Sequence, residues 1–96
     1  MTIQNTIESY IKKGFLKIYQ IEIPSVEFQA TRKEFKGDIT VVIFPLLRYI
    51  KGNPTEIGEK LGNYLLENVA EVINFNVING FLNLVIEDGY FLKLFN

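Results

Sequence analysis

Residues 72–87 contain the feature that most constrains the fold, an Asn79-Gly80 pair between two stretches of alternating side chains. This pair strongly predicts a two-residue hairpin turn, because both residues readily adopt positive φ angles. Successive side chains of a strand point to opposite faces. One face of the predicted hairpin is therefore aliphatic and suited to a core: Ile73, Phe75, Val77, Leu82, Leu84 and Ile86. The other face is unusual for a surface turned to water: Asn74, Asn76, Phe81, Asn83, Val85 and Glu87.

The length and composition restrict what kind of protein this is. A chain of 96 residues supports one hydrophobic core, so we expect a single domain over residues 1–96. The net charge of −1 gives no general attraction to nucleic acid or to anionic lipid, and a polyanion would have to meet a local basic patch. The chain has no cysteine and no histidine, which excludes disulfides and the commonest metal ligands. No apolar run reaches the ~18 residues of a membrane span, and we expect no membrane partner.

The first half of the chain predicts one helix followed by two strands. Residues 3–18 place apolar side chains at helical spacing, with Thr2 or Asn5 as candidate N-caps. Residues 26–31 alternate between apolar and polar side chains, which predicts a half-buried strand. Residues 39–44 are β-branched and almost continuously apolar, a composition typical of a central strand with both faces at least partly covered.

A second helix is predicted before the hairpin. Residues 46–50 are ambiguous, and we expect a short helical or irregular segment there. Asn53 and Pro54 have the residue types of an N-cap and a first helical position. Gly58 and Gly62 lie beside the apolar stripe of this helix, which predicts that its backbone approaches a sheet closely.

Together these elements predict an α+β fold. The order helix, strand, strand, helix, strand, strand indicates a two-layer sandwich in which two helices cover one face of a four-stranded, mainly antiparallel sheet. The opposite face is expected to be open, and the pattern does not determine the strand order. Residues 88–96 predict a short helical stub, and their large apolar residues suggest a domain cut from a longer protein.

The residues give little support for catalysis. Ser9 and Ser25 lack a convincing base partner for a nucleophilic site. No pair of carboxylates stands out as a glycosidase or metal site. The glycines do not form a phosphate-binding loop. We therefore expect no catalytic residue, no cofactor-binding residue and no metal ligand in these 96 residues.

Binding of an unpaired nucleic-acid base is the better-supported chemistry. A base stacks on an aromatic ring, and an amide hydrogen-bonds to its edge. Phe81 and Asn83 are neighbours on one strand face, with Asn74 and Asn76 expected across the hairpin. Basic residues in loops or strand ends near the centre of the sequence could meet phosphates: Arg32, Lys33, Lys36, Arg48 and Lys51. Each of these residues also has an interpretation without RNA. Exposed asparagines and solvated basic loops are common on protein surfaces, and the Phe81 ring could pack beneath a neighbouring segment or domain.

Three segments, in this order, resemble the N-terminal additional domain of arginyl-tRNA synthetase. They are Thr31-Arg-Lys-Glu-Phe-Lys-Gly-Asp38, Asn53-Pro-Thr-Glu-Ile-Gly-Glu-Lys-Leu61 and Phe75-Asn-Val-Ile-Asn-Gly-Phe-Leu-Asn-Leu-Val-Ile-Glu87. The family typically shows a Phe-Gly-Asp turn, a Pro-x-x-Ile/Leu-Ala-Glu-type helix and a Gly-aromatic-x-Asn strand. The resemblance covers nearly the whole chain and implies the same two-layer α-β-β-α-β-β fold.

The resemblance also implies a function. The family's domain docks on the outer corner of tRNA and contacts the D-loop, with the aromatic and amide positions that match Phe81 and Asn83. The implied parent is a cytoplasmic arginine–tRNA ligase that uses ATP with magnesium. Its catalytic domain would follow Asn96 in the same polypeptide, so this fragment would not be a ligase by itself. The alternative is a protein-interaction or self-association module that uses the open sheet face and the apolar stub.

Overall fold

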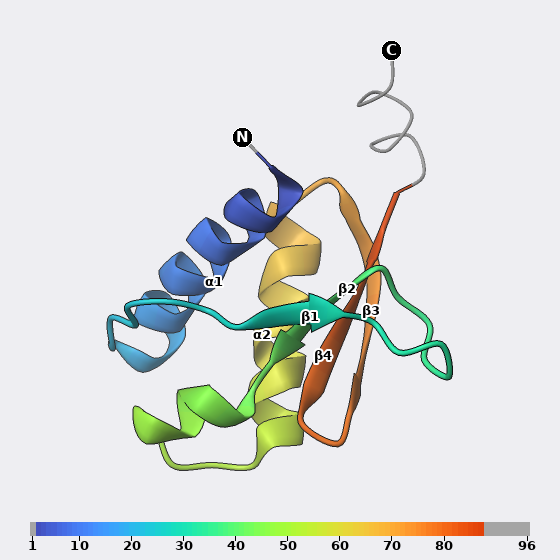
Figure 1. Cartoon of the computed structure of the whole chain (residues 1–96). Helices are drawn as coiled ribbons and strands as arrows, with labels where there is room; N and C mark the ends of the chain where they lie inside the picture. The colour runs from blue at the N-terminus through green and yellow to red at the C-terminus, as the bar shows by residue number, and fades with distance from the viewer. Residues whose placement is uncertain (1, 88–96) are drawn as a thin grey trace.

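The computed structural model describes residues 2–87, which form two helices, a short 3₁₀ helix and four strands (Figure 1). This order confirms the predicted α+β arrangement, while the stub predicted for residues 88–96 lies outside the described residues. The bounds in chain order are α1 (Ile3–Tyr19), β1 (Phe28–Ala30), β2 (Ile39–Val42), η1 (Phe44–Arg48), α2 (Pro54–Asn68), β3 (Val72–Ile78) and β4 (Phe81–Ile86).

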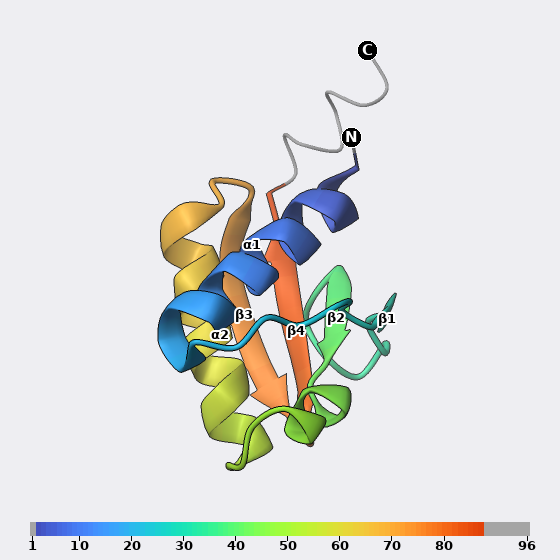
Figure 2. The ribbon, with the colours of Figure 1, turned by 90° about the vertical axis from the view of Figure 1, so that its left-hand side faces the viewer.

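The four strands form one antiparallel sheet in the order β1-β2-β4-β3. The β3–β4 hairpin turns at Asn79 and Gly80, with φ angles of 50° and 82°, as the Asn-Gly pair predicts. The β2 strand lies between β1 and β4, which confirms the central position expected from its composition. Both helices lie on the same face of the sheet, and α1 crosses in front of it in Figure 2.

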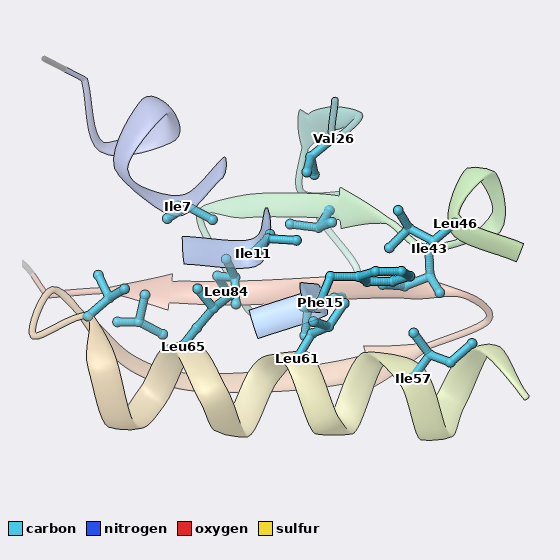
Figure 3. Close-up of a cluster of buried hydrophobic side chains, with 14 of the residues drawn as sticks. Ile7, Ile11, Phe15, Val26, Ile43, Leu46, Ile57, Leu61, Leu65 and Leu84 are labelled. Atoms are coloured by element: carbon cyan, nitrogen blue, oxygen red, sulfur yellow. The ribbon is translucent and has the colours of Figure 1, made fainter. Parts of the chain in front are cut away.

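The hydrophobic core fills the space between the helices and the sheet (Figure 3). Phe15 of α1, Leu61 and Leu65 of α2, and Leu84 of β4 are fully buried there. Figure 3 shows Ile43 and Leu46 extending toward the same cluster from the end of β2 and from η1. The 3₁₀ helix therefore closes one end of the core.

The two glycines of α2 let this helix lie directly on β3. A Cβ atom on Gly62 would lie 2.6 Å from ring carbons of Phe75, and one on Gly58 would lie 2.9 Å from Val77 Cγ1. Real Cβ atoms do not approach other atoms so closely. The predicted close approach of helix and sheet is confirmed, and the larger side chains belong to the strand.

The helix starts follow the predicted capping residues. Thr2 caps α1 by accepting a hydrogen bond from the Asn5 amide at 3.1 Å, and Asn53 caps α2 by accepting one from the Thr55 amide at 2.8 Å. The Glu8 carboxylate accepts a hydrogen bond from the Val26 amide at 3.0 Å. This bond ties the connection that precedes β1 to α1.

Some predicted boundaries, and one predicted face, differ from the structure. The first strand covers residues 28–30 rather than 26–31, the second covers 39–42 rather than 39–44, and the short helical segment covers 44–48 rather than 46–50. The placement of Ile73 on the core face is wrong. The β3 strand has an irregularity between Val72 and Asn74, so Val72 is buried opposite Ile86 and Ile73 is 55% exposed.

Candidate nucleic-acid interface

The strand register places the predicted site residues on the sheet face away from the helices. Residues directly opposite each other in paired strands share a face. Thr40 of β2, Asn83 of β4 and Asn76 of β3 therefore form one row across the sheet. Val42, Phe81 and Ile78 form the next row toward the hairpin turn.

The loop of residues 31–38 crosses this face, on the opposite side of the sheet from the helices (Figure 1). At one end the hydroxyl oxygens of Thr31 and Thr40 are 2.8 Å apart. At the other end the Asp38 amide donates to the Leu84 carbonyl, and the Asp38 carboxylate accepts from the Ile86 amide, both at 2.8 Å. The expectation of an open face is therefore wrong at its centre.

A directional chain of hydrogen bonds runs along the polar row. Asn76 Nδ2 donates to the Lys36 carbonyl at 2.6 Å, which leaves Asn76 Oδ1 to accept from Asn83 Nδ2 at 2.8 Å. The Thr40 hydroxyl donates to Asn83 Oδ1 at 2.6 Å. Since a hydroxyl has a single proton, the Thr31 hydroxyl donates to Thr40. The Lys36 carbonyl, which can only accept, thus sets the direction of the whole chain.

Asn83 is consequently buried, with only 1% of its surface exposed. Its amide oxygen and nitrogen each make one side-chain hydrogen bond, and each can make a second. Thr31 and Thr40 were not among the residues predicted for this site. Alternation places Thr40 on one face of its strand, but only the pairing of β2 with β4 places it beside Asn83.

Phe81 and Arg32 come together at the surface. The Arg32 guanidinium carbon lies 5.6 Å from the centroid of the Phe81 ring, within the range of a cation–π contact. Arg32 itself is exposed, whereas Phe81 is only partly exposed. The contact joins two of the predicted site residues that lie far apart in the sequence.

The remaining predicted residues lie around this centre. Asn76 belongs to the hydrogen-bonded row, while the exposed Asn74 lies opposite Val85 and its side-chain oxygen Oδ1 accepts from the Phe75 backbone amide. The side chains of Lys33 and Lys36 are exposed on the loop. The loop therefore presents three cations on the side of the sheet that carries Phe81.

Over residues 2–87 the structure has no cluster of three metal-binding side chains. Nor does this described part of the chain contain a helix with the length and apolar character needed to cross a membrane.

Burial raises the pKa of the Tyr19 phenol, and the nearby Lys60 ammonium opposes this shift, but Tyr19 lies on the helices and not at the interface. The chemistry that the interface offers is stacking, hydrogen bonding and positive charge.

Comparisons with known proteins agree on one family. The family model described as arginyl tRNA synthetase N terminal domain matches residues 1–86. The arginine–tRNA ligase of Flavobacterium psychrophilum is 47% identical, in an alignment that covers 100% of this chain and 18% of the relative. The arginine–tRNA ligase of Parabacteroides distasonis is 40% identical, covering 100% of this chain and 16% of the relative. The chain thus spans less than a fifth of the length of these relatives.

The fold is also found in a solved structure. The chain is similar to Thermus thermophilus arginyl-tRNA synthetase with a TM-score of 0.81, covering 97% of this chain and 15% of that protein. The sequence identity is 18%, so this likeness shows the shared fold.

Proposed function

This chain belongs to the family of arginyl-tRNA synthetase N-terminal domains, and we propose that it recognises arginine tRNA by binding an unpaired D-loop base at Phe81. The observation that carries the proposal is the pairing of a surface aromatic ring with the Arg32 guanidinium. Both groups are flat, and both stack on nucleic-acid bases. Lys33 and Lys36 on the same loop would meet neighbouring phosphates.

The base would stack on the Phe81 ring and move the Arg32 guanidinium onto its other side. Every base has a π-face, so stacking contributes affinity with little selectivity. The selectivity would come from an amide at the base edge. Asn83 lies two residues along β4 on the same face and retains one N–H and one lone pair for this purpose.

Access to Asn83 requires the middle of the loop to move. The loop is fastened to the sheet near Thr31 and at Asp38, while the Asn76–Lys36 bond holds its middle to the polar row. When residues 32–37 lift, the freed Asn76 amide would join Asn83 in contacting the base. The exposed Asn74 would lie beside the next part of the RNA backbone.

In the longer protein that we infer, this domain would be followed by a catalytic domain in the same polypeptide. That domain would attach arginine to the tRNA and would handle ATP and magnesium. The contribution of the present residues would be to hold the tRNA by its outer corner. Such a protein would work in the cytoplasm, where it meets its tRNA.

The proposal is tested by NMR titration of the isotope-labelled chain with an arginine tRNA transcript and with the same transcript altered in its D-loop. We expect shifts at Phe81, Asn83 and their neighbours, and smaller shifts with the altered D-loop. Shifts restricted to the basic loop, equal for both transcripts and abolished by modest salt, would contradict the proposal by indicating electrostatic docking alone.

Substitutions at Phe81 separate the aromatic ring from apolar bulk. Phe81→Leu is expected to weaken tRNA binding by about 1–3 kcal/mol, the contribution of one base stacked on an aromatic ring. Phe81→Tyr keeps the ring and is expected to retain most of the affinity. Leu16→Ala on the exposed side of α1 serves as the control. Equal affinities of Phe81→Leu and the unchanged chain would exclude stacking at this position.

A further inference from the structure

A second surface with stacking chemistry lies beside Phe81, in a hollow at the end of β2. The hollow measures about 780 Å³, within the range of about 300–1,000 Å³ that is usual for small-ligand sites. Its walls come from the segment before β1, the end of β2 and the η1 region, and include Ser25, Glu27, Val42, Phe44, Arg48 and Tyr49. Two of these are large aromatic residues at the surface, Phe44 at 51% exposed and Tyr49 at 38%.

The hollow is continuous with the surface that carries Phe81. Val42 lines the hollow and lies directly opposite Phe81 in the paired strands, so the two side chains share a face. A Cβ atom added at Gly80, the residue that precedes Phe81, would collide with the Phe44 ring. This shows that the Phe44 ring lies directly against Gly80. A chain that leaves the Phe81 ring can therefore reach the hollow without crossing the rest of the protein.

We propose that this hollow binds a second unpaired nucleotide of the same RNA loop, stacked on the exposed ring of Phe44, with its phosphate at Arg48. The proposal rests on the proposed function, because it assumes that a first base occupies Phe81. The chemistry fits a nucleotide: aromatic rings for the base, an exposed guanidinium for the phosphate, and the Ser25 and Glu27 side chains for polar base atoms. A carboxylate such as Glu27 can accept from the amino group of cytosine.

Arg48 gives one side of the hollow a positive charge that complements an RNA phosphate. Glu27 is the other charged residue of the lining and brings its net formal charge to zero, so a base edge rather than a phosphate suits that side. The occupant would thus be oriented, with its base toward Glu27 and its phosphate toward Arg48. A wholly apolar protein segment would leave both charged groups without partners.

The test measures binding of the 96-residue chain to an arginine tRNA transcript by fluorescence anisotropy. Phe44→Ala is expected to lower the affinity by about five- to 150-fold, the range for loss of one stacked base. Phe44→Tyr keeps an aromatic ring at this position and is expected to retain most of the affinity for tRNA. Arg48→Gln is expected to weaken binding and to lower the salt slope by about one phosphate contact. Leu66→Ala, which removes an apolar side chain that is 40% exposed on α2, is the matched control.

The outcomes separate this inference from the proposed function. If Phe44→Ala and Leu66→Ala bind equally well while Phe81→Leu binds weakly, the hollow takes no nucleotide and the D-loop contact at Phe81 stands. If the unchanged chain shows no specific tRNA binding, the proposed function itself fails. If Phe44→Ala keeps tRNA affinity but weakens binding to a separately produced catalytic domain, the occupant is protein and the inference is overturned.

Discussion

Asn83 is predicted to contact RNA, and the structure shows a different role for it, as the buried hydrogen-bond partner of Thr40. The alternation along β4 places Asn83 on the face of Phe81, as the sequence predicts. The alternation along β4 contains no information about the loop that covers this face, because residues 31–38 are separated from β4 in the sequence by more than forty positions. The buried row is consequently a finding of the structure, and it makes Asn83 important for stability as well as for the proposed recognition.

A double-mutant cycle tests this structural role. Thr40→Val and Asn83→Leu are each expected to lower the free energy of unfolding by about 1–3 kcal/mol, because each leaves buried polar partners unsatisfied. The double variant should lose less than the sum, with a coupling of about 0.5–3 kcal/mol. Urea unfolding measures all four proteins, and Thr55→Val on the exposed start of α2 is the control. Strictly additive losses would show that the 2.6 Å bond contributes no coupling.

The elements themselves were largely predictable because their signals are local. The Asn79-Gly80 pair specifies a turn whose residues need positive φ, and the Asn53-Pro54 pair specifies a helix start. The irregularity at Ile73 was not predictable, since Val72 and Ile73 are both β-branched and either suits the core. The choice depends on which of them lies opposite Ile86, and that register is a property of the assembled sheet.

The contact between α2 and β3 leads to a prediction at the same scale. Gly62→Ala is expected to destabilise the fold by about 1–3 kcal/mol through overpacking. This loss should outweigh the gain of about 1 kcal/mol in helix propensity, because the new methyl group would collide with the Phe75 ring. Asn63→Ala, the adjacent exposed position, is expected to change stability by less than about 0.5 kcal/mol. A rise in the melting temperature of Gly62→Ala would mean that the helix can move away from the sheet at little cost.

The whole molecule carries almost no net charge, so its attraction to RNA has to be local. With a net charge of −1, there is no general field to draw a polyanion onto every face. Arg32, Lys33 and Lys36 are all exposed on one loop beside Phe81. Hydrogen bonds from Asn76 to Lys36 and from Ile86 to Asp38 hold this loop on the sheet face away from the helices, and the sequence pattern did not predict these long-range contacts.

Because the positive charge is confined to one loop, we predict that the affinity for tRNA depends only weakly on salt concentration and that this dependence comes from the lysines of that loop. The two phosphate contacts at Lys33 and Lys36 contribute about −1.4 to −1.8 to the slope of log affinity against log salt, since each contact contributes about −0.7 to −0.9. Replacing Lys33 and Lys36 by glutamine should reduce the magnitude of the slope by about 1.5. Replacing Lys13 and Lys17, both exposed on α1, changes the net charge equally and should leave the slope unchanged. If both pairs of substitutions reduced the slope alike, the RNA would be sensing the charge of the molecule as a whole, and the loop would lose its proposed role.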